Sequence, residues 1–261
     1  MNWDFNLIFV DDGSEDGTTE IVQSYSSKNP RVILLKLPKG LGKGGCVAQA
    51  ILTQTLGDNV AFMDVDLSAD PSELQRLLPS LEDHDVVVGS RILRDGLRRV
   101  DRPFYRSLLS NSYSRLFRFL FRIPIYDPQC GFKVFRKDIT QRLFADITTF
   151  GFAFDTELIV TAFAQGLRIK EVPINWIHGE CSKINILHEI EAMGTDLFSI
   201  WYRFHMLGLQ NKRSYPQKRY SSYGRFLFSI LSLTNDGKAY ENGPRNGIKL
   251  DRTKSTFSLN D

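Results

Sequence analysis

The sequence is poor in the residue types that build disulfide scaffolds and metal knuckles. Its three cysteines, Cys46, Cys130 and Cys181, lie far apart, and none belongs to a C-x-x-C pair. This argues against a disulfide-rich protein and a zinc-knuckle protein, and it favours a reducing compartment. The four histidines show no metal-ligand spacing. We expect Cys130 to be a small buried residue and not a nucleophile.

Long apolar stretches are also missing. No run approaches the roughly 20 residues that a membrane-spanning helix needs. The N-terminus has no basic segment followed by an apolar core, so the sequence predicts no signal peptide. We therefore expect any membrane contact to be peripheral.

The composition is that of a folded protein, with 42% hydrophobic and 24% charged residues. A disordered chain, a collagen-like repeat and a coiled coil are excluded. Residues 1–210 carry a net charge of −3 and residues 211–261 a net charge of +6. Within the first part, Arg91–Arg122 holds nine arginines against two acidic residues. Such a run indicates either an anionic partner or a solvated helix face.

Short apolar runs alternate with helical patterns along the first half of the chain. Phe5–Val10, Val60–Met63 and Asp85–Val88 are nearly continuous apolar runs, typical of strands buried on both faces. Helical patterns over Thr18–Tyr25 and Cys46–Leu56 separate them. This rhythm predicts an α/β fold with a doubly wound, mostly parallel sheet flanked by helices.

The pattern changes beyond Arg91. Tyr105–Phe121 has a helical, aromatic and basic period, and Phe154–Gln165 predicts a second helix. Ile186–Gly208 is a long amphipathic segment, which either packs onto the domain or lies on a bilayer. We expect one domain over 1–210 and a basic, polar, largely disordered tail over 211–261.

Acidic residues follow two of the predicted strands. Asp64 and Asp66 come directly after one strand, and Asp11 and Asp12 follow another. Ligands in open α/β sheets bind outside the carboxyl ends of the strands. Paired carboxylates there are hard oxygen ligands for Mg²⁺ or Mn²⁺. The alternative for such a pair is an ordinary turn.

A glycine-rich segment lies between these acidic pairs. Gly40–Gly45 fails the Walker pattern, because a glycine follows Lys43 where Ser or Thr would hold magnesium. It either presents backbone N–H groups and Lys43 to a nucleotide or is a simple flexible turn.

Seven motifs in order now carry a family resemblance. They are VDDGSEDGT, GLGKGG, DVDLS, VVVGSR, DPQCGFKVF, FAFDTE and EVPINW followed by GECSK. Over Phe5 to Tyr202 the chain resembles the family-two glycosyltransferases with a GT-A fold. It is most similar to the dolichyl-phosphate mannose and glucose synthases, which transfer a sugar to a polyprenyl phosphate.

The resemblance implies roles on the donor side. Asp11 and Asp12 would contact the base and ribose, and Lys43 would lie near the nucleotide. Asp64 would face the ribose or the sugar beside the metal, and Asp66 would bind the Mg²⁺ or Mn²⁺ that bridges the diphosphate. Further along the chain, Gln129 would lie near the donor.

The resemblance also implies an acceptor side. Arg91, Arg106, Ser110 and Lys183 match positions that hold the acceptor phosphate. Asp155, with Glu157, matches an acidic pair near the sugar. The basic run would then guide a lipid phosphate to the site.

Two chemistries are open at this stage. A phosphate acceptor is already anionic and needs positioning by Arg91, Arg106 and Lys183, whereas a hydroxyl acceptor needs a general base, for which Asp155 is the candidate. The leading hypothesis is a metal-dependent inverting hexosyltransferase that uses UDP-glucose or GDP-mannose and polyprenyl phosphate. A hydroxyl-acceptor transferase and an inactive nucleotide-sugar-binding remnant are the alternatives.

The chain departs from the family pattern in two places. It starts before what corresponds to the second strand, so we expect the family's usual first strand to be absent. Ser68 stands where the mannose synthases often have glutamine, which leaves the sugar open. The expected location is cytoplasmic, peripheral on the cytoplasmic face of a membrane, and no nucleic-acid partner is expected.

Overall fold

The computed structural model describes residues 5–37, 40–54, 57–93, 104–177 and 186–206, with 250–251 and 256–257. At 104–107, 186–192 and the last two pairs only the backbone is described. Lys183 lies outside the described residues, and so does the 211–261 tail apart from those two pairs. The side chain of Arg106 is not described either.

The strands form two sheets. In the first, β1 (Leu7–Asp11) pairs in parallel with β2 (Val32–Lys36), from Leu7 opposite Val32 to Asp11 opposite Lys36. Beside β2 lie the short strands β8 (Thr256–Phe257) and β7 (Leu250–Asp251). The second sheet has the order β3-β5-β4-β6. Its strands are Asn59–Phe62 (β3), Lys133–Arg136 (β5), Val86–Ser90 (β4) and Ile169–Pro173 (β6).

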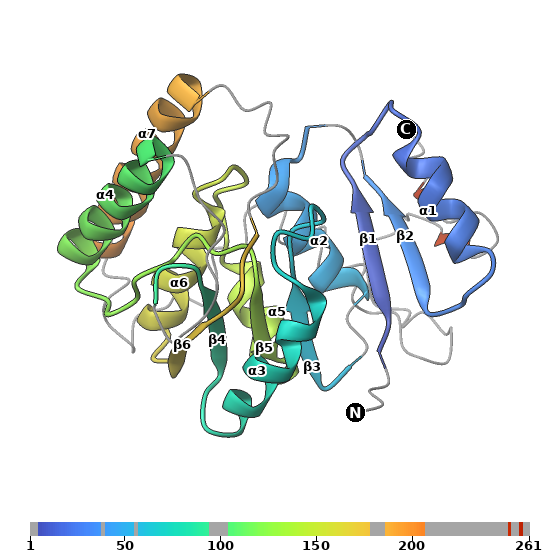
Figure 1. Cartoon of the computed structure of the whole chain (residues 1–261), viewed down its shortest axis with the longest axis horizontal. Coiled ribbons are helices and arrows are strands. Elements are labelled where there is room, and N and C mark those ends of the chain that lie inside the picture. Colours follow the sequence, from blue (N-terminus) through green and yellow to red (C-terminus); the bar gives the residue numbers. More distant parts are fainter. Residues whose placement is uncertain are drawn as a thin grey trace, which may run out of the picture.

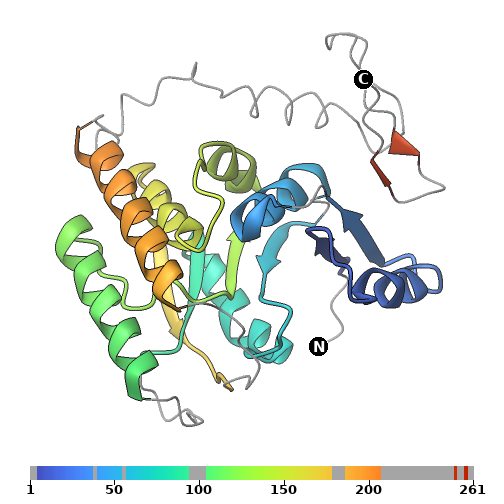
Figure 2. The same cartoon turned by 90° about the horizontal axis from the view of Figure 1, so that it is seen from above.

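Helices flank both sheets. They are α1 (Thr18–Ser26), α2 (Gly42–Gln54), α3 (Leu74–Leu77), α4 (Phe104–Phe121), α5 (Lys137–Ala145), α6 (Phe154–Ala164) and α7 (Ile186–Met206). Short 3₁₀ turns, η1 (Pro71–Glu73) and η2 (Leu78–Glu82), adjoin α3. Figures 1 and 2 agree that α4 and α7 lie side by side at one end of the molecule, with α1 at the other. The expected α/β architecture is confirmed.

The core lies around the second sheet. Val86, Val87 and Val88 of β4 are fully buried, as expected for a continuous apolar strand between two helical layers. Helix α6 is buried almost all round, because α2, α5 and α7 pack against it. No described helix has the length and apolar content needed to cross a bilayer.

One expectation about an individual strand needs correction, and one strand adds detail to the sheet. β1 was predicted to be buried on both faces, but Leu7 is 41% exposed and the next three residues are only half-buried. The physical reason is that β1 pairs with β2 in a separate sheet and lies outside the layers that cover β4. β5 runs antiparallel to both β3 and β4, so parallel pairing is limited to β1–β2, β2–β8 and β4–β6 among the described residues.

Candidate active site

Lysines and carboxylates from four segments form a continuous charged chain. The Lys43 Nζ lies 2.9 Å from Asp64 Oδ1 and 2.9 Å from Asp155 Oδ2. The Lys133 Nζ donates to Asp155 Oδ1 at 2.5 Å and to the carbonyl of Cys130 at 2.6 Å. We call Asp64, Lys43, Asp155 and Lys133 the charged chain. It runs from solvent, where the Asp64 side chain is 48% exposed, to the core, where Lys133 is fully buried.

The pKa shifts follow from these contacts. Burial disfavours the charged form of Asp155, but Lys133 and Lys43 outweigh it and hold the pKa of this carboxyl below its usual range. Burial also opposes the charge on Lys43, yet Asp155 and Asp64 outweigh it and raise the lysine pKa. Asp155 therefore stays ionised and Lys43 stays protonated near neutral pH.

The start of α2 is held by Asp12. Its Oδ1 accepts from the backbone N–H groups of Gly40 and Leu41 at 3.1 and 2.9 Å, and its Oδ2 accepts from that of Gly42 at 3.0 Å. Gly40 and Leu41 directly precede α2 and Gly42 is its first residue, so the carboxylate satisfies N–H groups that have no partner within the helix. The structure thus directs these three N–H groups to Asp12, where the sequence left open a nucleotide or a flexible turn.

Asp11 faces the opposite way, toward α1. Its carboxylate accepts from the Ser14 N–H at 2.9 Å and from the Thr19 hydroxyl at 2.5 Å. Burial opposes ionisation, but these hydrogen bonds outweigh it and lower the pKa of Asp11. Contact of Asp11 and Asp12 with a base or ribose stays a prediction.

The glycines beside Lys43 allow a second segment to come close. A Cβ on Gly42, whose φ is +70°, would lie 2.6 Å from the Phe150 carbonyl oxygen. A Cβ on Gly44 would lie 2.7 Å from the Thr149 carbonyl and 2.6 Å from Phe154 Cβ. The Gly44 N–H donates to the Phe150 carbonyl at 2.8 Å. The segment before α6 therefore sets the position of Lys43.

Asp64 and Asp66 lie on an exposed turn after β3. The Asp64 N–H donates to the Gly131 carbonyl at 3.2 Å, and Asp66 Oδ1 accepts from the Ser68 N–H at 2.9 Å. Leu67 has a φ of +54°, which is costly for a residue with a branched side chain and is found at ligand-binding turns. Among the described residues, no group of three or more His, Cys, Asp or Glu side chains could hold a metal.

Two carboxylates suit a magnesium-type ion that takes its other ligands from water and a substrate diphosphate. Asp64 and Asp66 fit this donor set, since both carry carboxylate oxygens and lie on a solvent-facing turn. The Lys43 ammonium already lies on Asp64, so this turn attracts positive charge.

Arg91 lies just beyond β4 with its guanidinium on Asp127. Nε and Nη2 donate to the two carboxylate oxygens at 2.8 and 2.7 Å, and the Arg91 N–H donates to Oδ2 at 2.8 Å. Burial opposes the charge, but Asp127 outweighs it and raises the arginine pKa. Glu171 in turn accepts from the Asp127 N–H at 2.7 Å. This bidentate pair was not predicted, and the acceptor-phosphate role of Arg91 stays a prediction.

Three other predicted site residues, Gln129, Ser110 and Arg106, lie on the loop before β5 and on α4. Gln129 is half-buried in the loop before β5, two residues from Gly131. Ser110 is half-buried on α4, one turn before Tyr113, whose hydroxyl lies 2.7 Å from the Thr156 hydroxyl on α6. Position 106 is the third residue of α4. None of these observations tests their predicted contact with a ligand.

Cys130 is a small buried residue, as expected. Its side chain is buried, and burial together with nearby Asp127 raises the pKa of the thiol to about 12. A thiol this weakly acidic supplies no thiolate near neutral pH.

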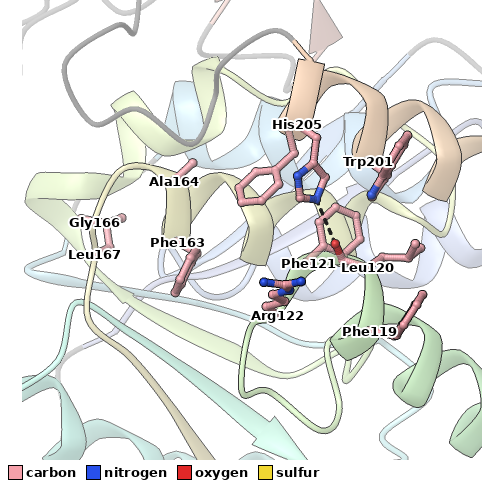
Figure 3. A pocket seen from close by; sticks show the side chains of 11 residues that line it. Phe119, Leu120, Phe121, Arg122, Phe163, Ala164, Gly166, Leu167, Trp201 and His205 are labelled. Atoms are coloured by element: carbon pink, nitrogen blue, oxygen red, sulfur yellow. Dashed lines mark hydrogen bonds between the residues drawn. The ribbon is translucent and has the colours of Figure 1, made fainter.

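A separate pocket of about 800 Å³ lies between α4, α6 and α7. Figure 3 shows Phe119, Arg122, Phe163 and Trp201 around it, with His205 Nε2 2.9 Å from the Leu120 carbonyl. It adjoins the C-terminal end of α6, whereas Asp155 lies at the N-terminal end. At 1.5 Å per residue the two ends are about 15 Å apart, so this pocket is distinct from the charged chain.

The fold and the charged turn after β3 define an α/β protein whose acidic strand ends suit a cation, and such a cation could in turn bind a diphosphate. Residues 2–144 match the family described as glycosyl transferase family 2. The chain belongs to this family.

Named relatives match most of the chain. It is 33% identical over 213 residues to the dolichyl-phosphate beta-glucosyltransferase of Drosophila melanogaster, covering 78% of this chain and 65% of that protein. The human protein of the same name is 30% identical over 209 residues, covering 77% and 64%. Glycosyltransferase AglD of Haloferax volcanii is 30% identical over 231 residues, covering 88% and 36%. The chain thus spans between 36% and 65% of the length of these relatives.

A solved structure shows the same fold. Glucosyl-3-phosphoglycerate synthase from Mycobacterium tuberculosis, in complex with Mn²⁺, UDP and phosphoglyceric acid, aligns with a TM-score of 0.56 at 20% identity. The alignment covers 76% of this chain and 66% of that one. The predicted GT-A fold is therefore confirmed.

Proposed function

We propose that this chain transfers a hexose from a nucleotide diphosphate sugar to a polyprenyl phosphate such as dolichyl phosphate, with inversion at the anomeric carbon. The names of its relatives support this acceptor class. The acidic turn after β3, at the carboxyl end of the strand, supports a diphosphate donor.

The state of Asp155 is the observation that carries the acceptor assignment. Both of its oxygens accept from lysines, and its side chain is 3% exposed. A general base works best when its pKa is near the operating pH and when it can reach the proton it removes. Asp155 meets neither condition, since its pKa is lowered and its oxygens are engaged. An acceptor that arrives already ionised, such as a phosphate, needs no such base.

The reaction then balances without a proton transfer. An acceptor phosphate oxygen forms the new bond to the anomeric carbon as the bond from that carbon to the donor diphosphate breaks. The nucleoside diphosphate leaves with the electron pair. The chain's own contribution is to orient the donor diphosphate and the acceptor phosphate. When two bound reactants combine, such orientation supplies a large part of the catalytic effect. Lys43 is proposed for the donor side, and Arg91, Arg106, Ser110 and Lys183 are proposed for the acceptor phosphate.

UDP-glucose is the donor we propose. Two of the relatives described above are glucosyltransferases by name, and the solved structure with the same fold carries UDP. GDP-mannose, the other donor that the sequence left open, has no comparable support. Asp11, Asp12 and Gln129 are the remaining proposed donor contacts.

A divalent cation, Mg²⁺ or Mn²⁺, is proposed on Asp64 and Asp66. When bound, it would neutralise the charge that grows on the departing diphosphate. The two carboxylates would hold it, and the Gly131 carbonyl fixes the backbone of Asp64 by accepting from the Asp64 N–H.

The face formed by α4 and α7 is proposed to rest on a membrane, on its cytoplasmic side. Exposed apolar side chains gather there, with Phe119 80% and Phe198 65% exposed. Arg115 on α4 and Arg122 directly after it are both exposed, and residues 104–122 contain no acidic residue. Aromatic and basic side chains together suit an anionic lipid surface.

The direct test is transfer of label into lipid. The purified chain is incubated with Mn²⁺, a short polyprenyl phosphate and radiolabelled UDP-glucose, with GDP-mannose in parallel, and label is counted in the organic phase. We expect label from UDP-glucose that is lost in Asp66→Ala and kept in Arg136→Ala, a change at an exposed ion pair away from the turn. Full transfer by Asp66→Ala would refute the metal site. Nucleotide binding without transfer would favour the non-catalytic alternative.

Membrane contact has its own test. We expect the chain to sediment with vesicles that contain anionic lipid, and Phe119→Ser/Arg122→Ser to reduce the bound fraction. Leu7→Ser, at an exposed apolar residue of β1 far from α4, is the control. Equal sedimentation of all three proteins would overturn the proposed surface.

A further inference from the structure

Helix α7 reaches the segment before α6 through one arginine. The Arg203 Nη1 donates to Glu157 Oε1 at 2.5 Å and also to the Thr148 hydroxyl. Its Nη2 lies 3.4 Å from the Thr149 hydroxyl. The Glu157 side chain is only 3% exposed, so this is a largely buried ion pair.

Glu157 holds the same two threonines by their backbone. Its Oε2 accepts from the N–H groups of Thr148 and Thr149 at 3.1 and 2.6 Å, and its Oε1 accepts from the Thr148 hydroxyl at 2.9 Å. Three of these contacts use a charged acceptor, which makes them stronger than hydrogen bonds between neutral groups. Arg203 completes the set, because it supplies the cation that balances the buried carboxylate.

The segment fixed in this way is the one that touches Gly42 and Gly44. Thr149 and Phe150 present their carbonyl oxygens to these glycines, and the Gly44 N–H bonds to the Phe150 carbonyl. Lys43 lies between the two glycines. A shift of the Thr148–Phe150 segment would therefore move Lys43 against Asp64 and Asp155.

We propose that Arg203 is a positioning residue for the donor site. It acts through Glu157 and the Thr148–Phe150 segment to keep Lys43 in place, and it joins helix α7 to the nucleotide-binding side of the domain. No sequence pattern assigned a role to this arginine, and Glu157 was expected near the sugar. This inference rests on the proposed function in so far as the donor is a nucleotide sugar.

The test measures donor binding and not turnover. UDP-glucose is titrated by calorimetry in the presence of Mn²⁺ into the full chain and its variants, well below their unfolding temperatures. We expect Arg203→Ala to weaken binding about tenfold, the scale found when residues that support a ligand-binding shell are removed. Arg203→Lys keeps a charge within reach of Glu157, so it should recover part of the affinity.

A matched control separates positioning from loss of stability. Phe204→Leu removes packing of the neighbouring α7 residue against Phe121, where the ring centroids are 5.7 Å apart, and leaves the Arg203 contacts in place. It should lower the unfolding temperature as Arg203→Ala does, but bind UDP-glucose like the unmodified chain. Glu157→Gln should weaken binding like Arg203→Ala, and the double variant should add little more.

The outcomes are distinguishable. If the unmodified chain binds no UDP-glucose, the proposed function fails and the inference falls with it. If it binds and Arg203→Ala binds equally well, only the inference is overturned. Equal weakening by Phe204→Leu would also overturn it, because loss of helix packing would then explain the effect.

Discussion

Asp64 occupies the space that a side chain on Gly131 would need. A Cβ built on Gly131 would collide with Oδ2 of the Asp64 carboxylate, while the Gly131 carbonyl accepts from the Asp64 N–H at 3.2 Å. The two residues come from different segments, the turn after β3 and the loop before β5. Their close approach fixes the direction of the carboxylate proposed to hold the cation.

Gly131→Ala should therefore displace Asp64. We expect Mn²⁺-dependent binding of UDP-glucose to fall at least about tenfold, as for lost support of a metal ligand. Calorimetric titration measures this directly. Gly194→Ala is the control, because a Cβ there meets no atom within 4 Å. In a helix that change should leave binding unaltered and raise stability slightly. Unchanged binding in Gly131→Ala would show that the Asp64 position is not needed.

Removal of the Asp12 carboxylate should destabilise the start of α2. Three backbone N–H groups depend on it, and loss of a capping side chain costs about 1–2 kcal/mol of unfolding free energy. We expect this loss in Asp12→Ala and a smaller one in Asp12→Asn, which keeps one acceptor oxygen. Urea unfolding measures both. Asp16→Ala, which removes an exposed bond to the Thr18 N–H, should cost less than Asp12→Ala.

The sequence predicted the elements around the site better than the contacts within it. Acidic residues at strand ends were identified from local patterns, because an apolar run followed by Asp-x-Asp is visible in a short window. Lys133 was missed, since a lysine inside a strand pattern indicates an exposed position, whereas here Asp155 compensates its buried charge. That partner is 22 residues away along the chain.

Other misses have the same physical origin. Helix α5 was also missed. It starts directly after β5 with no intervening loop to mark its start, although buried Ile139 and Leu143 have helical spacing. Arg91 was assigned to the acceptor without its partner Asp127, which is 36 residues distant. Long-range ion pairs leave no local signal, so sequence patterns indicated the candidate residues but not which of them pair.

The inner half of the charged chain should behave as a coupled buried pair. In Lys133→Met, Asp155 loses one of its two cations, and in Asp155→Leu the buried Lys133 charge is left unpaired. Breaking a buried pair from one side typically costs about 3–5 kcal/mol, whereas replacing both partners by apolar residues costs far less. We therefore expect each single variant to unfold at clearly lower urea concentration. The double variant should recover much of the loss. Additive losses would show that the two groups do not interact.

Asp146 should make stability depend on pH. Burial, opposed by a hydrogen bond from Gln165, raises the pKa of this carboxyl from 3.8 to about 6 in the folded chain. The folded state then binds more protons than the unfolded state between these two values. The stabilisation from the protonated Asp146 carboxyl is fully present below the unfolded pKa and is lost as the pH rises through the folded pKa.

Asp146→Asn removes the charge and keeps an acceptor for Gln165. We expect it to raise the unfolding free energy by about 1–2 kcal/mol at about pH 8, with little change at about pH 4. Urea unfolding at both pH values measures this, and Asp138→Asn, at an exposed ion pair, should not show the same pH dependence. An equal gain at both pH values in Asp146→Asn would mean that the ionisation of this carboxyl does not cause the effect.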